Sequence, residues 1–336
     1  MELTFSLQRK FFDAILSQYA KRTDALVAIA SVLKVGKDSV YRRLRGDSII
    51  TPGEMELLVR EFRISLDSLL FEGNLDTVMF SFNAFAQKEI TFHKYLSSVD
   101  SDFQYLQHIP NVVVKYASSE IPLFYYCLFP ELIAFKLYVW GRTIWDLDFL
   151  NGRNFSFELL DTPSRLLAQS IFEKYIKLES IEMWSANLFD NTINQIEYHV
   201  QNGCIIERDI ALQLLAALQG LAQHMQTMAT VGKKISDKLN ADTGTPFTLY
   251  HNEIIYTNNT IYIESPFLRI VFTTFVNPNY LRSFDTRICD YTHSWFDSVI
   301  QKSNLISVQN EKARASFFNG IQRKITLAKN RIETME

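Results

Sequence analysis

One segment of the chain limits its fold more than any other, the run 121–140, in which 16 of 20 residues are hydrophobic. A run this long has to be buried, either across a membrane or inside a large core. Pro122 and Pro130 interrupt it, and Glu131 and Lys136 add charges that a membrane span would have to bury. We therefore expect a buried core helix here, no membrane segment, and a C-terminal region large enough to enclose the helix.

The whole chain has the composition of a globular protein. Of its 336 residues, 47% are hydrophobic, and the net charge is −3, which excludes an intrinsically disordered chain and gives no global field that favours nucleic acid. The length predicts two or three domains. The three cysteines are far apart, and the N-terminus lacks the pattern of a signal peptide. These features favour a cytoplasmic protein with reduced thiols.

Residues 1–75 differ from the rest because their apolar residues recur in short helical blocks. Gly46 is a typical residue for ending a helix, and Thr51-Pro52-Gly53-Glu54 has the capping-box pattern that begins one. These signals predict a compact domain of five short helices, at about 6–19, 24–33, 37–45, 52–62 and 66–71.

Two helices around the break Lys34-Val35-Gly36, together spanning Ile29–Gly46, resemble the Cro/repressor type of helix-turn-helix, the XRE family. The segment Ile64–Leu70 looks like the one that closes this lambda-repressor-like five-helix domain. The resemblance covers about residues 6–73. It implies that 37–45 is a recognition helix for the major groove of DNA, in a bacterial transcriptional regulator.

The charge and the helical geometry of this segment agree with the resemblance. Val40 and Leu44 share the inner face of the predicted helix, so that Arg42 and Arg45 point outward. Residues 31–50 carry a local net charge of +3, although residues 1–76 together are neutral. The sequence therefore predicts modest non-specific affinity for DNA and a reliance on base contacts.

The family positions imply a role for individual side chains. The start of the recognition helix and the position one turn later would read bases, and these are Lys37, Asp38 and Arg42. The residues expected to contact phosphate or to position the helix are Lys34, Ser39, Tyr41, Arg43, Arg45 and Thr51.

Residues 76–336 show mostly helical patterns, and we recognise no family in them. One helix is expected from Pro163 to about Trp184, and two more at about 280–302 and 307–332. Residues 246–276 alternate in polarity, with a hairpin turn at Asn258-Asn259, and predict a small antiparallel sheet. The predicted fold class is thus mainly α, with a helical domain for dimerisation and effector sensing. The basic last helix is expected to dock on a core or on a partner subunit, and the alternative is contact with a membrane or with DNA.

The aromatic residues after position 120 allow two interpretations. A packed core or a dimer interface is the ordinary one. The other is a pocket for a small apolar effector. The candidate lining residues of that pocket are Tyr125, Tyr126, Trp140, Arg142 and Trp145.

The motif search favours a binding protein over an enzyme. The sequence contains no glycine-rich phosphate loop and no metal-ligand spacing of histidines or cysteines, so we expect no cofactor and no metal. The leading hypothesis is a homodimeric, sequence-specific DNA-binding regulator, because one helix reads only a few base pairs. The alternatives are a protein-interaction scaffold that uses both domains and an enzyme with an added helix-turn-helix.

Overall fold

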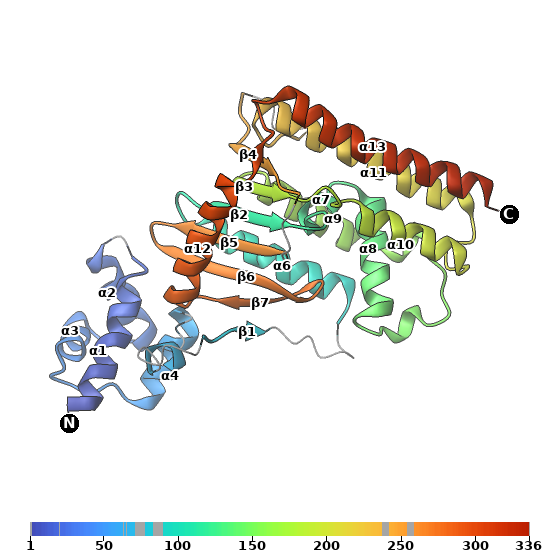
Figure 1. Ribbon diagram of the computed structural model, residues 1–336. Helices are drawn as coiled ribbons and strands as arrows, with labels where there is room; N and C mark the ends of the chain where they lie inside the picture. The colour runs from blue at the N-terminus through green and yellow to red at the C-terminus, as the bar shows by residue number, and fades with distance from the viewer. Residues whose placement is uncertain are drawn as a thin grey trace.

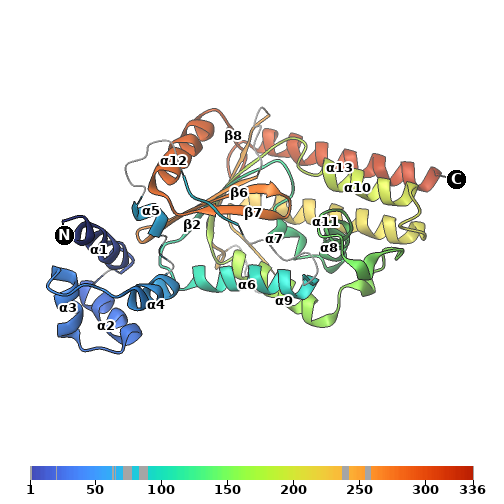
Figure 2. The ribbon, with the colours of Figure 1, turned by 90° about the horizontal axis from the view of Figure 1, so that it is seen from below.

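The computed structural model describes residues 2–19, 21–62, 64, 66–70, 78–82, 90–236, 242–253 and 259–335, without the side chains of 2–6, 67 and 68. The N-terminal helices lie together beside the sheet (Figures 1 and 2). Their buried side chains, among them Phe11, Ile29 and Leu58, form a hydrophobic cluster of their own. The boundary predicted near 75 lies outside the described residues. These helices are α1 (Glu2–Leu16), α2 (Arg22–Leu33), α3 (Lys37–Arg45), α4 (Pro52–Phe62) and α5 (Leu66–Leu70).

The ends of these helices follow the local signals. Lys34 adopts a left-handed conformation, with φ of 53°, and ends α2. Gly46, with φ of 82°, ends α3, so the bounds predicted for this helix are confirmed. At the start of α4 the Glu54 amide donates to the Thr51 hydroxyl and the Thr51 amide donates to the Glu54 carboxylate. This is the capping box that the sequence predicts.

The C-terminal region is built on a sheet, which corrects the predicted fold class. Within the described residues, eight strands form one mixed sheet in the order β1-β7-β6-β5-β2-β3-β4-β8. The fold is therefore α/β, and the prediction of a mainly α protein with a small antiparallel sheet was wrong. The strands are β1 (Ser81–Phe82), β2 (Val113–Ser118), β3 (Glu179–Trp184), β4 (Phe247–His251), β5 (Thr260–Ser265), β6 (Leu268–Val276), β7 (Asn279–Ser283) and β8 (Asn304–Leu305).

The centre of the sheet is parallel and its sides are antiparallel. β2, β3 and β4 are parallel neighbours joined by helical crossovers, whereas β5, β6, β7 and β1 form an antiparallel series beside β2. Strand β4 was expected in the hairpin region but pairs with β3 and β8. The strand predicted at 254–257 lies outside the described residues.

Parts of two predicted helices form strands in the structure. Residues 179–184 form β3 instead of ending the helix from Pro163, and residues 279–283 form β7 before the next helix. Most side chains of β3 are buried, because the strand lies in the middle of the sheet. Such a strand lacks the polar alternation that distinguishes a half-exposed strand from a helix.

Helices cover both faces of the sheet (Figure 2). On one face, α12 (Thr286–Gln301) packs on β5 and β6 over a small cluster that includes Tyr262 and Phe296. The other helices enclose the main hydrophobic core. They are α6 (Phe92–Gln107), α7 (Leu123–Tyr126), α8 (Pro130–Thr143), α9 (Thr162–Tyr175), α10 (Asp190–Gln201), α11 (Arg208–Val231) and α13 (Glu311–Thr334), with the short turns η1 (Asp148–Leu150) and η2 (Phe157–Leu159).

The apolar run 121–140 folds into α7 and the first part of α8, and the side chains of α7 are all buried. In the part of the chain that the structure describes, no helix has both the length and the hydropathy to cross a bilayer. The buried-helix interpretation of the run is confirmed.

Helix α13 docks on α11 and α10, as expected, and its Lys324 ammonium lies 2.7 Å from the Asp190 carboxylate.

Candidate nucleic-acid interface and ligand pocket

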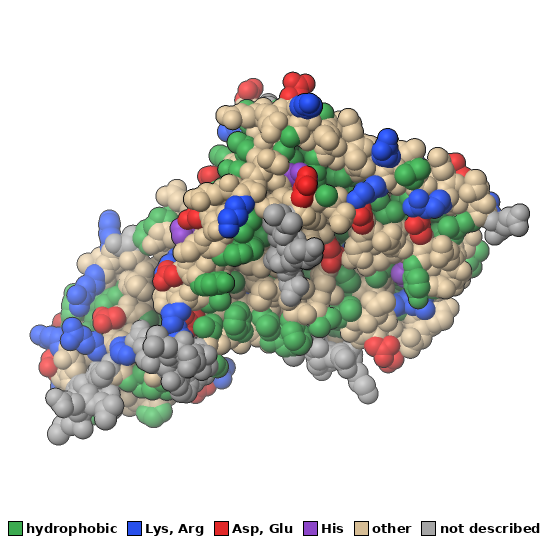
Figure 3. Space-filling view, in the orientation of Figure 1, with side chains coloured by type: hydrophobic (Ala, Val, Ile, Leu, Met, Phe, Trp, Pro, Cys, Tyr) green, Lys and Arg blue, Asp and Glu red, His purple; other side chains and the backbone are tan. Residues whose placement is uncertain are grey.

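Helix α3 has one buried side and one exposed side. Val40 is fully buried in the N-terminal cluster, and Leu44 packs partly against it. Asp38 and Arg42 are exposed on the opposite side, and Lys37 is exposed at the start of the helix. These are the three residues predicted to read bases. Figure 3 shows Lys and Arg side chains gathered over this N-terminal end of the molecule. The helix can thus be held by the domain and still present polar groups to a partner.

Arg43 is held inside the domain instead of facing solvent. Its side chain is 15% exposed, and its Nη2 lies 2.6 Å from Glu54 Oε1 on α4. Its Nη1 also donates to the carbonyl of Ser39 at 3.0 Å. Although partial burial opposes ionisation, hydrogen bonds from Arg43 and Thr51 lower the pKa of Glu54. Arg43 therefore ties α3 to α4, and its guanidinium is not free for a phosphate.

A buried glutamine that the sequence interpretation missed fixes the segment after α3. Gln8 on α1 donates from Nε2 to the carbonyls of Arg43 and Ser48, at 2.7 and 2.8 Å. Its Oε1 accepts the amide of Ile50 at 2.9 Å. Gln8 thus bonds three backbone groups, among them the buried amide of Ile50, whereas the Arg43 carbonyl also accepts the amide of Gly46 at 3.1 Å. A polar residue three positions before Phe11 on an apolar helix face was the available signal.

The other residues predicted to position the helix differ in their exposure to solvent and in the partners they already have. Lys34 and Tyr41 are exposed, whereas Ser39 is half-buried. The guanidinium of Arg45 is 67% exposed and lies 3.4 Å from Asp47 Oδ2, an interaction that solvent weakens. Thr51 is also exposed, but its hydroxyl already accepts the Glu54 amide.

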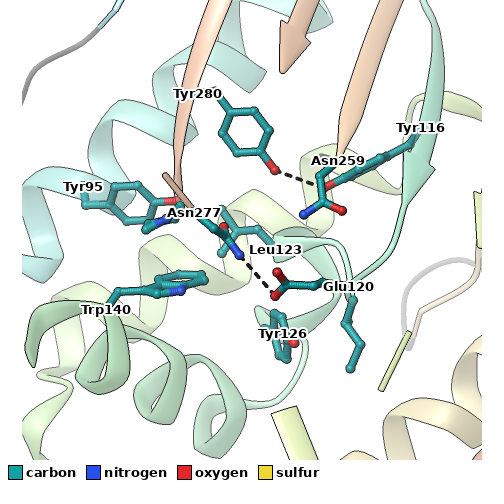
Figure 4. A pocket seen from close by; sticks show the side chains of 11 residues that line it. Tyr95, Tyr116, Glu120, Leu123, Tyr126, Trp140, Asn259, Asn277 and Tyr280 are labelled. Carbon is teal, nitrogen blue, oxygen red and sulfur yellow. Dashed lines mark hydrogen bonds between the residues drawn. The ribbon is translucent and has the colours of Figure 1, made fainter. Parts of the chain in front are cut away.

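Two of the five candidate pocket residues meet at one pocket. Tyr126 of α7 and Trp140 of α8 line a space that is also bordered by aromatic residues from α6, β2 and β7 (Figure 4). The space is small, about 10 Å³, which suffices for one water molecule. Its full lining comprises Tyr95, Tyr116, Glu120, Ile121, Leu123, Tyr126, Trp140, Asn259, Asn277, Pro278 and Tyr280.

The polar groups of this pocket lie at one end of the strands, where β2 ends and β5 begins. Glu120 follows the carboxyl end of β2, Asn259 precedes β5, and Asn277 lies in the turn between β6 and β7. Asn277 Nδ2 donates to Glu120 Oε2 at 3.1 Å, and the hydroxyls of Tyr116 and Tyr280 are 3.1 Å apart. These residues were not predicted from the sequence, because only the strand order brings them together.

Tyr125 points away from this pocket, into a buried polar cluster around Glu182 of β3. The Glu182 carboxylate accepts hydrogen bonds from the Tyr125 hydroxyl at 2.7 Å and from Trp184 Nε1 at 2.9 Å. The hydroxyls of Tyr175 and Ser180 donate to it as well. None of these side chains is exposed. The cluster anchors the core and is closed to a ligand.

A lysine completes this cluster. Lys234 Nζ lies 3.5 Å from the centroid of the Tyr175 ring and is fully buried. Burial lowers the pKa of Lys234 to about 7, against the attraction of Glu182.

The two remaining pocket candidates also lie elsewhere. Arg142 donates from Nη1 to the Tyr138 hydroxyl at 2.8 Å and to Cys204 Sγ at 2.9 Å. Trp145 packs against Tyr95, with ring centroids 5.0 Å apart, behind the pocket wall. Its Nε1 has no hydrogen-bond partner among the described residues.

The described residues contain no group of three or more His, Cys, Asp or Glu side chains that could hold a metal ion. Comparisons of the chain with protein-family models, with curated proteins and with solved structures found no match.

Proposed function

We propose that this protein is a sequence-specific DNA-binding transcriptional regulator of the bacterial cytoplasm, with α3 as its recognition helix. The observation that carries the proposal is the division of α3 into a held side and a free side. Val40 and Arg43 fix the helix to the domain, whereas Lys37, Asp38 and Arg42 are exposed on a segment with a local charge of +3. This is what a helix needs in order to enter a major groove and contact base edges.

The exposed side chains divide by chemistry. Arg42 can donate two hydrogen bonds to guanine, and Asp38 can accept one from cytosine N4. Lys34 and Arg45 supply positive charge for phosphates, which positions the helix without reading sequence. We assign Arg43 to holding α3 in place. Because one helix reads few base pairs, the proposal includes a homodimer that binds two half-sites.

The test begins with selection of bound sequences from a random DNA pool by the full-length protein. A palindrome among the recovered sequences is the expected result. The affinity for that site is then measured by fluorescence anisotropy at several salt concentrations, beside an unrelated duplex. We expect Arg42→Ala to weaken binding to the selected site at least tenfold and to change binding to the unrelated duplex little. Lys34→Ala should weaken both and reduce the salt slope by about 1.

Arg9→Ala is the matched control, because Arg9 is an exposed arginine on α1, outside the recognition helix, and lies 4.0 Å from Asp13. It should leave both affinities near the wild-type values. If no sequence is enriched, or if Arg42→Ala binds like the wild type, α3 does not read DNA, and the scaffold alternative takes its place.

A further inference from the structure

The pocket beside β2 combines a single carboxylate with several aromatic rings. Among its described lining residues, Glu120 carries the carboxylate, and Tyr95, Tyr116, Tyr126, Trp140 and Tyr280 supply the rings (Figure 4). Burial raises the pKa of all four tyrosines, so their hydroxyls stay neutral. A negative charge surrounded by electron-rich ring faces is an environment that attracts a cation.

The protein places one of its own cations against this wall. The ammonium of Lys136 lies 5.2 Å from the Tyr126 ring centroid and 5.3 Å from that of Trp140. It donates to Gln195 Oε1 at 2.9 Å, and Glu120 Oε2 is 4.0 Å away. Lys136 is 1% exposed, so an alkylammonium group is already accommodated here away from bulk solvent.

The two oxygens of Glu120 are used unequally. Oε2 receives both contacts, from Asn277 and from Lys136. Oε1 accepts no hydrogen bond from the residues that the structure describes, and Glu120 lines the space together with the rings. That space has the volume of one water molecule, which suits an NH₃⁺ group but not a trimethylammonium group.

We propose that this pocket binds the ammonium group of a small primary aliphatic amine, with Glu120 Oε1 as its acceptor and the rings of Tyr126 and Trp140 beside it. Lys136 is then a competitor for the same carboxylate. Because burial lowers the pKa of Lys136 to about 8, the lysine can lose its proton when a second cation binds Glu120.

Two paired strands, β7 and β1, connect the pocket to the segment that follows the N-terminal domain. Asn277 and Tyr280 belong to the turn and the start of β7, and β7 pairs with β1. The hydroxyl of Ser283 on β7 also donates to the carbonyl of Met79 at 2.6 Å, just before β1. An amine that moves Tyr280 therefore acts on the segment that follows the DNA-binding domain. This last step, in which the amine modulates DNA binding, rests on the proposed function.

Binding is tested without DNA, by titrating the full-length protein with methylammonium and following tryptophan fluorescence and the heat of binding. Methanol, which has nearly the same shape and no charge, and tetramethylammonium, which is too large for the space, are the comparison probes. We expect saturable binding of methylammonium and at least tenfold weaker binding of both others. Glu120→Gln should weaken methylammonium binding at least tenfold, and Lys136→Met should strengthen it.

Glu131→Gln is the matched control, since Glu131 begins α8 and does not line the pocket. It should bind like the wild type. The opposite signs expected for Glu120→Gln and Lys136→Met separate a direct role from loss of folding, which would weaken binding in both. Equal binding of the amine and the alcohol, no saturable binding, or an unchanged affinity in Glu120→Gln overturns the pocket.

The connection to β1 is tested by hydrogen exchange of residues 78–82 and 279–283, with and without methylammonium. Slower exchange in both strands is expected, and no change in either overturns the connection. Anisotropy with the selected DNA site, measured with and without the amine, tests the step that rests on the proposed function. If no DNA site is selected but the amine binds through Glu120, the regulator proposal fails and the amine site stands.

Discussion

Charged side chains serve the two regions of the molecule in different ways. In the N-terminal domain, Arg43 and Glu54 form a partly buried pair that holds α3, and the neighbouring charges of Lys37 and Arg42 remain exposed. In the C-terminal region, Glu182 and Lys234 are fully enclosed and surrounded by hydrogen-bonding or aromatic groups. The first arrangement leaves charge available to a partner, and the second uses charge to fix a core.

The largest expected effect tests the enclosed charge. Glu182→Leu leaves four buried donors without their acceptor, and we expect the free energy of unfolding to fall by about 3–5 kcal/mol. Urea unfolding followed by circular dichroism measures it. Glu179→Leu, at an exposed position of the same strand, should change stability by less than about 0.5 kcal/mol. Equal effects of the two substitutions would show that the cluster does not anchor the core.

The second largest effect is expected for Gln8, whose side chain bonds the backbone at the end of α3 and just after it. Gln8→Ala leaves the buried amide of Ile50 without its acceptor and should cost about 2 kcal/mol of local stability. Hydrogen exchange of the α3 amides reports the local opening, which should become faster. Gln18→Ala removes one bond, from Nε2 to the Phe62 carbonyl, at a more exposed position and should have the smaller effect. A larger effect of Gln18→Ala than of Gln8→Ala would show that Gln8 does not hold α3 in place.

The pH dependence of the free energy of unfolding tests the buried lysine, Lys234. The pKa of Lys234 is about 7 in the folded protein, whereas an unfolded lysine keeps its proton to about 10.4. Between pH 7 and 8.5 the unfolded state thus binds more protons, so stability should rise with pH, by up to about 1.4 kcal/mol per unit. The slope should be smaller in Lys234→Met than in the wild type, whereas Lys302→Met, at an exposed lysine, should keep it.

The smallest effect distinguishes two arginines of α3, Arg43 and Arg45. Arg43→Ala breaks the partly buried pair with Glu54 and should cost about 1 kcal/mol of stability. Arg45→Ala breaks an exposed pair and should cost less than about 0.5 kcal/mol. Under the proposed function it should also weaken DNA binding, because a phosphate contact is lost. Urea unfolding and anisotropy on both variants provide the comparison. A larger loss of stability in Arg45→Ala would contradict the assigned roles.

Local signals predicted the five helices of the N-terminal domain, although α1 begins and ends about three to four residues earlier than expected. The bounds of α3 and the capping box of α4 were predicted because glycine, proline, threonine and glutamate act on their immediate neighbours in the chain. The side of α3 that Val40 buries followed from helical periodicity. The structural role of Arg43 was not predictable, because its partner Glu54 lies on the next helix and the sequence does not state the angle between them.

The sheet and the pocket depended on distant pairing. Strand β3 resembled the end of a helix because no glycine or proline separates it from α9 and both of its neighbours bury it. Tyr126 and Trp140 were predicted as pocket residues, because aromatic density is visible in a sequence. Glu120, Asn277 and Tyr280 were not, because they meet only when β2 and β7 take their places in the strand order.

The pairing of β1 with β7 also sets an order for folding during translation. The Ser283 hydroxyl and the Met79 carbonyl that it contacts are 204 residues apart in the chain, so the ribosome completes the N-terminal helices long before β7 exists. Those helices contact near neighbours in sequence and can form early, whereas this edge of the sheet must wait for a long loop to close. Until then Phe80 and Phe82, which remain 37% and 43% exposed even after folding, have no β7 beside them. Nascent chains that stall before residue 279 should therefore be the species most dependent on chaperones.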